Sequence, residues 1–129
     1  MKSFIIVRNS FKATHNWPQA SEVAGEQVKF LEAEHRHTFH FKTSLEVMHD
    51  DRDVEFFVFQ AQVREAFNEL YGPRPEGVEL AYRLGRKSCE MLGKEVIAKL
   101  RETHGYTQSM MCEVWEDNEV GALTQDLKD

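Results

Sequence analysis

Three of the six histidines have a spacing that could bind a metal ion. His35 and His37 are separated by one residue, so on a β-strand both imidazoles would point to the same face, about 7 Å apart. His15 ends an earlier alternating segment. If the two segments pair as antiparallel strands, the end of one meets the start of the other and the three rings converge. Three neutral nitrogen donors suit zinc and leave a fourth position for water or substrate, which indicates a centre of the catalytic type.

Each of these histidines also has a plainer interpretation as a packed core residue. A single His-x-His pair on a strand is more often structural than metal-binding. A third histidine at a matched strand end makes the two interpretations about equally expected. His40 falls on the opposite strand face and His49 lies in a charged turn, so we interpret both as surface residues.

Other side chains give weaker signals of chemistry. Glu116 ends an otherwise apolar strand face, where a carboxylate could accept two parallel N–H bonds from a planar guanidine-like edge. Glu32 and Glu34 precede His35 and could act as bases, although solvated loop carboxylates are the favoured interpretation. Cys89 opens a predicted helix, whose dipole would lower a thiol pKa, but a small packed cysteine is favoured there.

The segments that would position the histidines alternate with a period of two. From Ser3 to His15, Ile5, Val7, Phe11 and Ala13 share the side of His15. From His35 to about Met48, an apolar face alternates with a polar one. Both patterns predict half-buried strands. Residues 16–34 form a long connection that contains turn-forming residues and no predicted helix or strand. Long connections of this kind are often functional.

The period changes to that of a helix after residue 58. Apolar residues at helical spacing predict an amphipathic helix from Phe59 to Leu70, which Gly72-Pro73 ends. A second helix is predicted from the N-cap Ser88 to about His104, before Gly105. Its predicted apolar stripe consists of Met91, Leu92, Val96, Ile97 and Leu100.

Two further strands are predicted near the C-terminus, a long one over residues 110–117 and a short one over 120–123, followed by a frayed tail at 124–129. Residues 54–58 could be a short strand or the approach to the first helix. The order strand, strand, helix, helix, strand, strand predicts an α+β fold, with an antiparallel sheet and two helices on one face. Such a sheet has open edges, which invite pairing with other subunits.

Composition narrows the class of protein. The chain has 129 residues and a net charge of -6, which fits one domain over residues 1–129 and disfavours binding to phosphate backbones. Two cysteines are too few for a disulfide framework. The apolar run Phe4-Ile5-Ile6-Val7 is too short for a signal peptide or a membrane span, which need about 7 and 20 residues respectively. We therefore expect a soluble cytoplasmic protein that binds neither nucleic acid nor membrane.

Several motifs together resemble the 6-pyruvoyl-tetrahydropterin synthase / 6-carboxy-tetrahydropterin synthase family. They are FKATHNW, HRHTFHF, FQAQVREAF, SCEMLGKEVIAKL and CEVWEDNEVGA, and their order covers most of the chain. In that family a strand-end histidine and a His-Gly-His bind zinc. His15, His35 and His37 match those positions, with Arg36 in place of the glycine. The resemblance implies the tunnelling fold and association into a barrel, usually a hexamer.

The resemblance also implies residues that bind the pterin. Glu116 matches the glutamate that anchors the pterin, although Asp117 stands where a hydroxyl residue is usual. Glu90 is similar to the acidic residue that opens the second helix near the pterin pocket. The catalytic cysteine of the family is replaced by Leu31, and the segment after the first helix lacks the family's Asp-His pair. One subgroup uses a glutamate for the cysteine, a role that Glu32 or Glu34 could fill with a shift in register.

The function that follows is a zinc-dependent enzyme acting on a reduced pterin, such as dihydroneopterin triphosphate. The implied chemistry is that of a carbon–oxygen lyase or an aldolase-type enzyme, in tetrahydropterin or queuosine biosynthesis. The alternative is a diverged pterin- or purine-binding protein of the same fold that keeps the metal for structure. A third possibility is that the histidines are plain core residues and the resemblance misleads.

Overall fold

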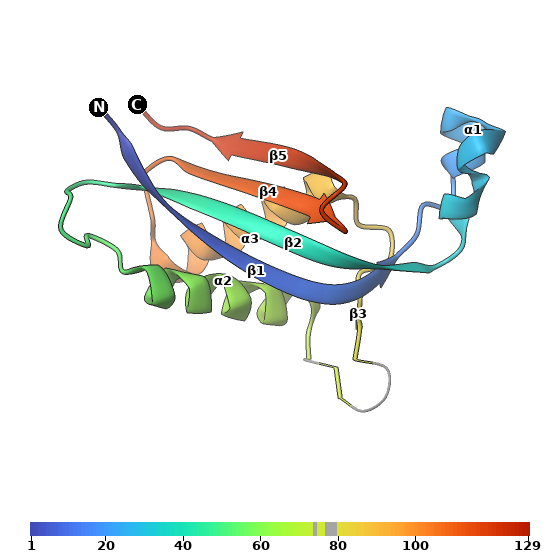
Figure 1. Ribbon diagram of the computed structural model, residues 1–129, viewed down its shortest axis with the longest axis horizontal. Helices are drawn as coiled ribbons and strands as arrows, with labels where there is room; N and C mark the ends of the chain where they lie inside the picture. The colour runs from blue at the N-terminus through green and yellow to red at the C-terminus, as the bar shows by residue number, and fades with distance from the viewer. Residues whose placement is uncertain (74, 77–79) are drawn as a thin grey trace.

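The sheet has the strand order β3-β1-β2-β4-β5 in a computed structural model that describes residues 1–73, 75–76 and 80–129 (Figure 1). The strands are β1 (Ser3–His15), β2 (His35–Val47), β3 (Tyr82–Arg83), β4 (Met110–Glu116) and β5 (Val120–Asp126). The pairs β1–β2, β2–β4 and β4–β5 are antiparallel, whereas the short β3 runs parallel to β1. The prediction of an α+β fold is confirmed, although β3 was not predicted and makes the sheet mixed.

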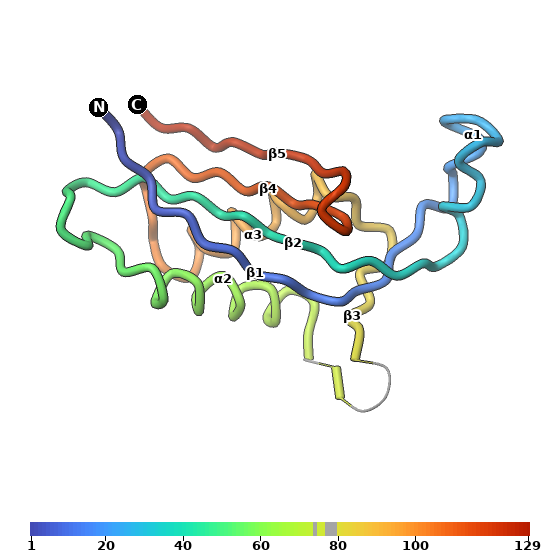
Figure 2. Tube along the Cα trace, viewed as in Figure 1, coloured from blue at the N-terminus to red at the C-terminus, as the bar shows by residue number. Residues whose placement is uncertain are grey.

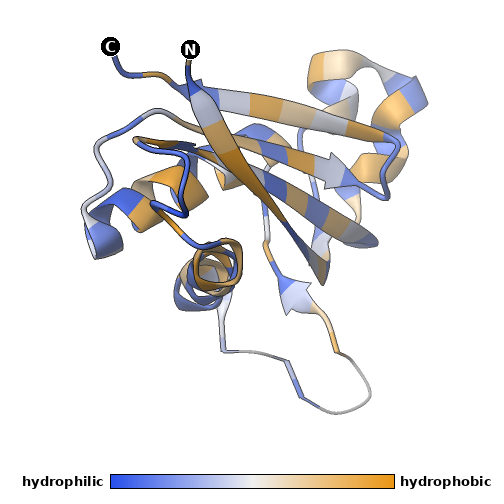
Figure 3. Ribbon diagram, turned by 60° about the vertical axis from the view of Figure 1, so that its left-hand side comes forward, coloured by the Kyte–Doolittle hydropathy of each residue, from blue (hydrophilic) through white to orange (hydrophobic). Residues whose placement is uncertain are grey.

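Two helices of 16 residues cover one face of this sheet, as predicted. They are α2 (Phe56–Tyr71) and α3 (Cys89–His104). Helix α2 packs against β1, α3 packs against β4 and β5, and the two helices contact each other. Figure 3 shows hydrophobic and hydrophilic residues mixed along both helices and the strands, and the buried helix residues include Phe59 and Val63 of α2 and Leu92 and Val96 of α3.

Capping residues mark where the helices begin and end. The Ser88 hydroxyl caps the start of α3 by accepting the Met91 N–H, as predicted. Gly105 ends α3 in the left-handed conformation with a φ of 69°, also as predicted. Helix α2 begins three residues before the predicted start at Phe59, because the Glu55 carboxylate caps it by accepting the Val58 N–H.

The core lies between the helices and the inward faces of β1, β2 and β4. The aromatic rings of Phe11 and Phe67 stack with centroids 3.7 Å apart, and Phe41 meets both edge-on. The alternation predicted for β1 holds, because Val7, Phe11 and Ala13 are buried, and that of β2 holds up to Thr43. It fails at Ser44 and Glu46, which belong to the predicted polar face but are buried; the Glu46 carboxylate accepts the Ser109 N–H and lies near Lys2. Met91 is a correction to the predicted stripe of α3. Its side chain is 49% exposed, because it lies on the first turn of the helix and lines a pocket.

Two more predictions are corrected in the connections. Residues 16–34 contain α1 (Ala20–Ala24) and the 3-10 helix η1 (Glu26–Glu32), which stand away from the sheet beyond the end of β1 (Figure 1). Neither helix has a capping side chain at its N-terminus, so no capping residue marks where either one begins. Residues 124–126 are not frayed. They extend β5, where the Asp126 carboxylate accepts the Arg101 Nε–H at 2.8 Å.

The two ends of the chain lie side by side (Figure 2), and the Lys2 ammonium donates to the Lys128 carbonyl oxygen at 3.0 Å. Helices that could cross a membrane are absent from the described residues. The segment that lacks the family's Asp-His pair covers residues 69–77, of which positions 74 and 77 are outside the described residues.

Candidate metal centre

The pairing of β1 with β2 brings the three predicted histidines together. His15 is directly opposite His35 in the antiparallel register, and Ala13 is opposite His37. The ring centroids are 4.6 Å apart for His15 and His35, 5.3 Å for His15 and His37, and 4.9 Å for His35 and His37. One ligand nitrogen from each ring lies within 4.8 Å of the other two. Strand register therefore brings three side chains that could hold a metal ion together at one corner of the sheet.

Each of the three rings is oriented by an oxygen at its Nδ1 atom. The acceptors are the Lys87 carbonyl for His15 (2.9 Å), the Ala33 carbonyl for His35 (2.8 Å) and the Asp117 carboxylate for His37 (2.6 Å). Because these oxygens accept hydrogen bonds, Nδ1 carries a proton in each ring, and in the neutral form of the ring Nε2 keeps its lone pair.

The Nε2 atoms of His35 and His37 are buried and lack a hydrogen-bond partner within the described part of the chain. Buried polar atoms are nearly always satisfied, so two such atoms side by side point to a missing partner. Neutral imidazoles with free Nε2 atoms and Nδ1–H groups fixed by oxygens form the donor set that zinc prefers. The residues present therefore fit a zinc ion.

Burial favours the neutral form of His15, whose side chain is 11% exposed. Desolvation lowers the pKa of His15 and outweighs two opposing effects, the hydrogen bond to the Lys87 carbonyl and the negative charge of Glu116. A neutral imidazole is the form that binds a metal.

The Glu116 carboxylate lies beside the Nε2 atoms of two of the histidines. Its Oε1 atom is 3.3 Å from His15 and its Oε2 atom is 3.5 Å from His37, the latter without hydrogen-bond geometry. Glu116 is at the end of β4, next to Phe39 of β2. The structure thus places this predicted binding residue at the edge of the histidine cluster.

A cavity of about 390 Å³ opens beside the cluster and is called the histidine pocket below. Glu90, the other predicted binding residue, lines it together with Glu116. Its wall also includes His15, Trp17, Leu31, His35, Arg86, Cys89, Met91 and Val120. The pocket combines apolar surface with two carboxylates, an arrangement typical of small-molecule sites.

Cys89 is a packed residue, which confirms the interpretation favoured from the sequence. It is buried and its thiol donates to the Glu116 carboxylate at 3.6 Å. Desolvation and the charge of Glu116 raise the pKa of Cys89 to about 12. The thiol therefore stays protonated at neutral pH and is no nucleophile.

The carboxylates of Glu32 and Glu34, just before β2, contact residues other than the three histidines. The Glu32 carboxylate accepts the backbone N–H and the hydroxyl of Ser21, and these hydrogen bonds lower the pKa of Glu32. Glu34 lies 3.9 Å from the Arg83 guanidinium. Neither is among the residues that line the histidine pocket, whereas Leu31 is.

Asp117 and the Lys87 carbonyl are site groups that sequence reasoning missed. The backbone oxygen leaves no signal in the residue type. Asp117 has the left-handed φ of 53° in the turn after β4, and its hydrogen bonds from His37 and the Thr38 N–H lower the pKa of its carboxyl. The Asp-Asn pair before β5 was a signal for a tight turn, but not for a contact with His37.

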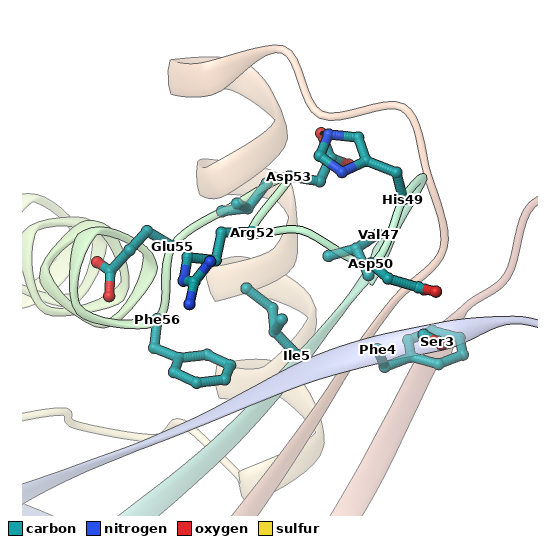
Figure 4. A pocket seen from close by; sticks show the side chains of 11 residues that line it. Ser3, Phe4, Ile5, Val47, His49, Asp50, Arg52, Asp53, Glu55 and Phe56 are labelled. Atoms are coloured by element: carbon teal, nitrogen blue, oxygen red, sulfur yellow. Dashed lines mark ion pairs between the residues drawn. The ribbon is translucent and has the colours of Figure 1, made fainter.

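The two histidines predicted to be surface residues lie apart from the cluster. His40 is on the outer face of β2, where its Nδ1 atom is 2.8 Å from the Ser10 hydroxyl. His49 follows β2 at the opposite end of the sheet and lines a different pocket (Figure 4).

The fold is that of 6-pyruvoyl tetrahydropterin synthase, the tunnelling fold that the sequence resemblance implied. The Plasmodium falciparum enzyme superposes with a TM-score of 0.65 at 14% identity, covering 98% of this chain and 99% of the other. The Plasmodium vivax enzyme gives a TM-score of 0.65 at 14% identity, with 99% of each chain covered. A P. vivax variant with a catalytic glutamate replaced by cysteine gives 0.64 at 15% identity and the same coverage. No protein-family model and no curated protein matches the chain.

Proposed function

We propose that this chain is a zinc-dependent enzyme that acts on a reduced pterin, such as dihydroneopterin triphosphate, as a single domain over residues 1–129. The observation that carries the proposal is the convergence of three histidines, each with an oxygen acceptor at Nδ1 and with one ring nitrogen within 4.8 Å of those of the other two. The fold shared with 6-pyruvoyl tetrahydropterin synthases supports the substrate class.

His15, His35 and His37 would hold the zinc ion through their Nε2 atoms. Zinc bound there would supply Lewis acidity to oxygen atoms of the substrate side chain. The protein's part is to orient the three rings, which the acceptors at Nδ1 do. Partial burial of the rings limits access of water to this corner of the sheet.

Glu116 would orient the pterin ring. A carboxylate can accept two parallel N–H bonds, and the 2-amino group and N3–H of a pterin present such a pair. Glu116 reaches the cluster from the end of β4 and also lines the histidine pocket. A ring held on Glu116 would therefore extend its side chain toward the three Nε2 atoms.

The proton carrier would be a carboxylate close to the metal. The P. vivax structures include variants of a catalytic glutamate, but Glu32 and Glu34 of this chain contact Ser21 and Arg83 instead. Glu90 already lines the histidine pocket. We therefore propose that Glu90 contacts the pterin beside Glu116, and we assign the proton transfer to neither residue.

The alternative is a pterin- or purine-binding protein in which the metal has a structural role. It is favoured by Leu31, which lines the pocket at the position matched to the family's catalytic cysteine. Product analysis separates the two functions. An enzyme forms product that disappears with His37→Ala, whereas a binding protein retains ligand affinity and forms none.

Calorimetric titration of the zinc-loaded chain with a dihydroneopterin derivative tests the proposal. We expect Glu116→Gln to weaken binding roughly 10–100-fold, because a hydrogen bond to a charged group contributes about 1.5–3 kcal/mol. Glu113→Gln is the matched control, since Glu113 is on the same strand but pairs with Lys42 on the outer face. Absence of any affinity for the pterin, or equal affinity in both variants, would contradict the proposal.

We further propose that the chain assembles into a homo-oligomer, with a hexamer expected from the resemblance. Its support is the open edge of β5, which pairs only with β4 among the described residues, and the edge of β1, which β3 covers only at Ala13 and Thr14. Unpaired strand edges favour association. Light scattering of the purified chain gives the subunit number, and a monomer at micromolar concentration would contradict the assembly.

A further inference from the structure

His37 lies between two consecutive carboxylates, one at each ring nitrogen. The Asp117 carboxylate accepts the Nδ1–H at 2.6 Å, whereas the Glu116 carboxylate is 3.5 Å from Nε2. The shorter contact is at Nδ1, whereas the metal of the proposed function would bind Nε2. Of the three acceptors at Nδ1 atoms, the one that contacts His37 is the only charged one. Charged acceptors form the stronger hydrogen bonds.

Asp117 is held in place by the backbone next to His37. Its N–H donates to the Thr38 carbonyl at 2.9 Å, and its Oδ1 atom accepts the Thr38 N–H at 2.8 Å. The left-handed φ of 53° at Asp117 turns the chain out of β4, and it is a conformation that Asp and Asn tolerate. With Oδ1 engaged by Thr38, Oδ2 remains for the His37 ring.

We propose that Asp117 is a positioning residue that fixes His37 as the Nδ1–H tautomer and thereby keeps its Nε2 lone pair available for the metal. This inference rests on the metal centre of the proposed function. Neutral imidazole has one protonated nitrogen, and the partner of one nitrogen decides the state of the other. A carboxylate can only accept, so it holds the proton on Nδ1.

Asp117→Asn reverses this preference while it keeps the shape of the side chain. The Thr38 N–H still requires an oxygen at the Oδ1 position, so the amide must present its NH2 group to His37. The ring then accepts at Nδ1 and carries its proton on Nε2, where it blocks the metal. Asp117→Gly removes the side chain and leaves Nδ1 to water, with either tautomer accessible.

Zinc affinity, measured by competition with a chromophoric chelator at pH 7, tests the inference. We expect Asp117→Asn to weaken zinc binding about 10–100-fold and Asp117→Gly to weaken it less. A role in packing alone predicts the reverse order, because glycine removes more contacts. Glu119→Gln is the matched control, as Glu119 is an exposed carboxylate of the same turn. Equal affinities for wild type and D117N, or a greater loss in D117G, would overturn the inference.

A second measurement reads the tautomer without any metal. Long-range 1H–15N correlation spectra of the metal-free chain distinguish the Nδ1–H from the Nε2–H form of His37. We expect the Nδ1–H form in wild type and the Nε2–H form in D117N. An Nε2–H form in wild type overturns the role of Asp117. A wild type that binds no zinc instead overturns the metal centre, and with it the function of the fixed tautomer, so the two failures are distinguishable.

Discussion

The β1–β2 pair has a pocket at each end, and each pocket contains a histidine beside carboxylates. The histidine pocket, of about 390 Å³, lies where β1 ends and β2 begins. The other pocket, of about 290 Å³, lies where β1 begins and β2 ends, and Figure 4 shows Arg52, Asp53 and Phe56 around Ile5 there. The same residue types thus occur at both ends in different arrangements.

The two ends differ in what the ring nitrogens contact. At the second pocket, Nδ1 of His49 accepts the Asp51 N–H at 3.3 Å, and Nε2 is 3.6 Å from the Asp53 carboxylate. The His49 side chain is 60% exposed, so water also reaches it. At the histidine pocket, the buried Nε2 atoms of His35 and His37 lack hydrogen-bond partners among the described residues. A histidine beside a carboxylate is therefore an ordinary surface pair, and only convergent free nitrogens indicate a metal.

The largest effect expected is the loss of metal binding after removal of one clustered histidine. His35→Ala leaves two nitrogen donors, so zinc affinity should fall by more than the roughly 10–100-fold typical of residues that only orient a ligand. His49→Ala should leave zinc affinity unchanged. Competition with a chelator measures both variants. Equal zinc affinity in H35A and wild type would contradict the claim that the histidine pocket binds a metal and the pocket of His49 does not.

An intermediate effect is expected on stability against pH in the metal-free chain. The pKa of His15 is lowered from its ordinary value of 6.5 by desolvation, so the unfolded chain binds more protons than the folded one as pH falls. The contribution of His15 is therefore present above about pH 6.5 and is lost below it.

Urea unfolding at pH 7.5 and 5.5 measures this dependence. We expect His15→Gln to reduce the loss of stability on acidification, while the exposed His49→Gln leaves that loss as in wild type. The same loss in H15Q as in wild type would contradict the assignment of the shifted pKa to His15.

The smallest effect expected concerns the residues with left-handed backbone near the two pockets, Arg52 near one and Asp117 and Asn118 near the other. Arg52 has a φ of 55° and Asp117 a φ of 53°. Arg52→Gly should stabilise the fold by on the order of 0.5–1 kcal/mol, because relief of about 1–2 kcal/mol of left-handed strain exceeds the entropy cost of a glycine, about 0.5–1 kcal/mol. Zinc affinity should not change. Chemical unfolding and chelator competition check both, and a destabilised R52G would contradict this account of the turn.

Strand alternation made the histidine cluster predictable. A strand with one apolar face has a register fixed by burial, because a shift by one residue would expose its core side chains. His15, His35 and His37 lie on those apolar faces, and the observed register puts His15 opposite His35. Local pattern and tertiary structure agree in this part of the chain.

The missing parts of the prediction depend on contacts between distant segments. Asp117 binds His37 across 80 positions of sequence, and its role follows from a turn conformation that residue types alone only suggest. The helices within residues 16–34 are short and lack side-chain caps. Strand β3 pairs over two residues only, too few for a periodic signal.

The central claim is that three imidazoles from β1 and β2 bind one zinc ion and leave a position open. Zinc titration of the metal-free wild-type chain, followed by X-ray absorption at the zinc edge, tests it most directly. The account predicts one zinc per chain, with three imidazole nitrogens at about 2.0–2.1 Å and one further light ligand. A chain that takes up no zinc, or a zinc ion with fewer than three imidazole ligands, would contradict it.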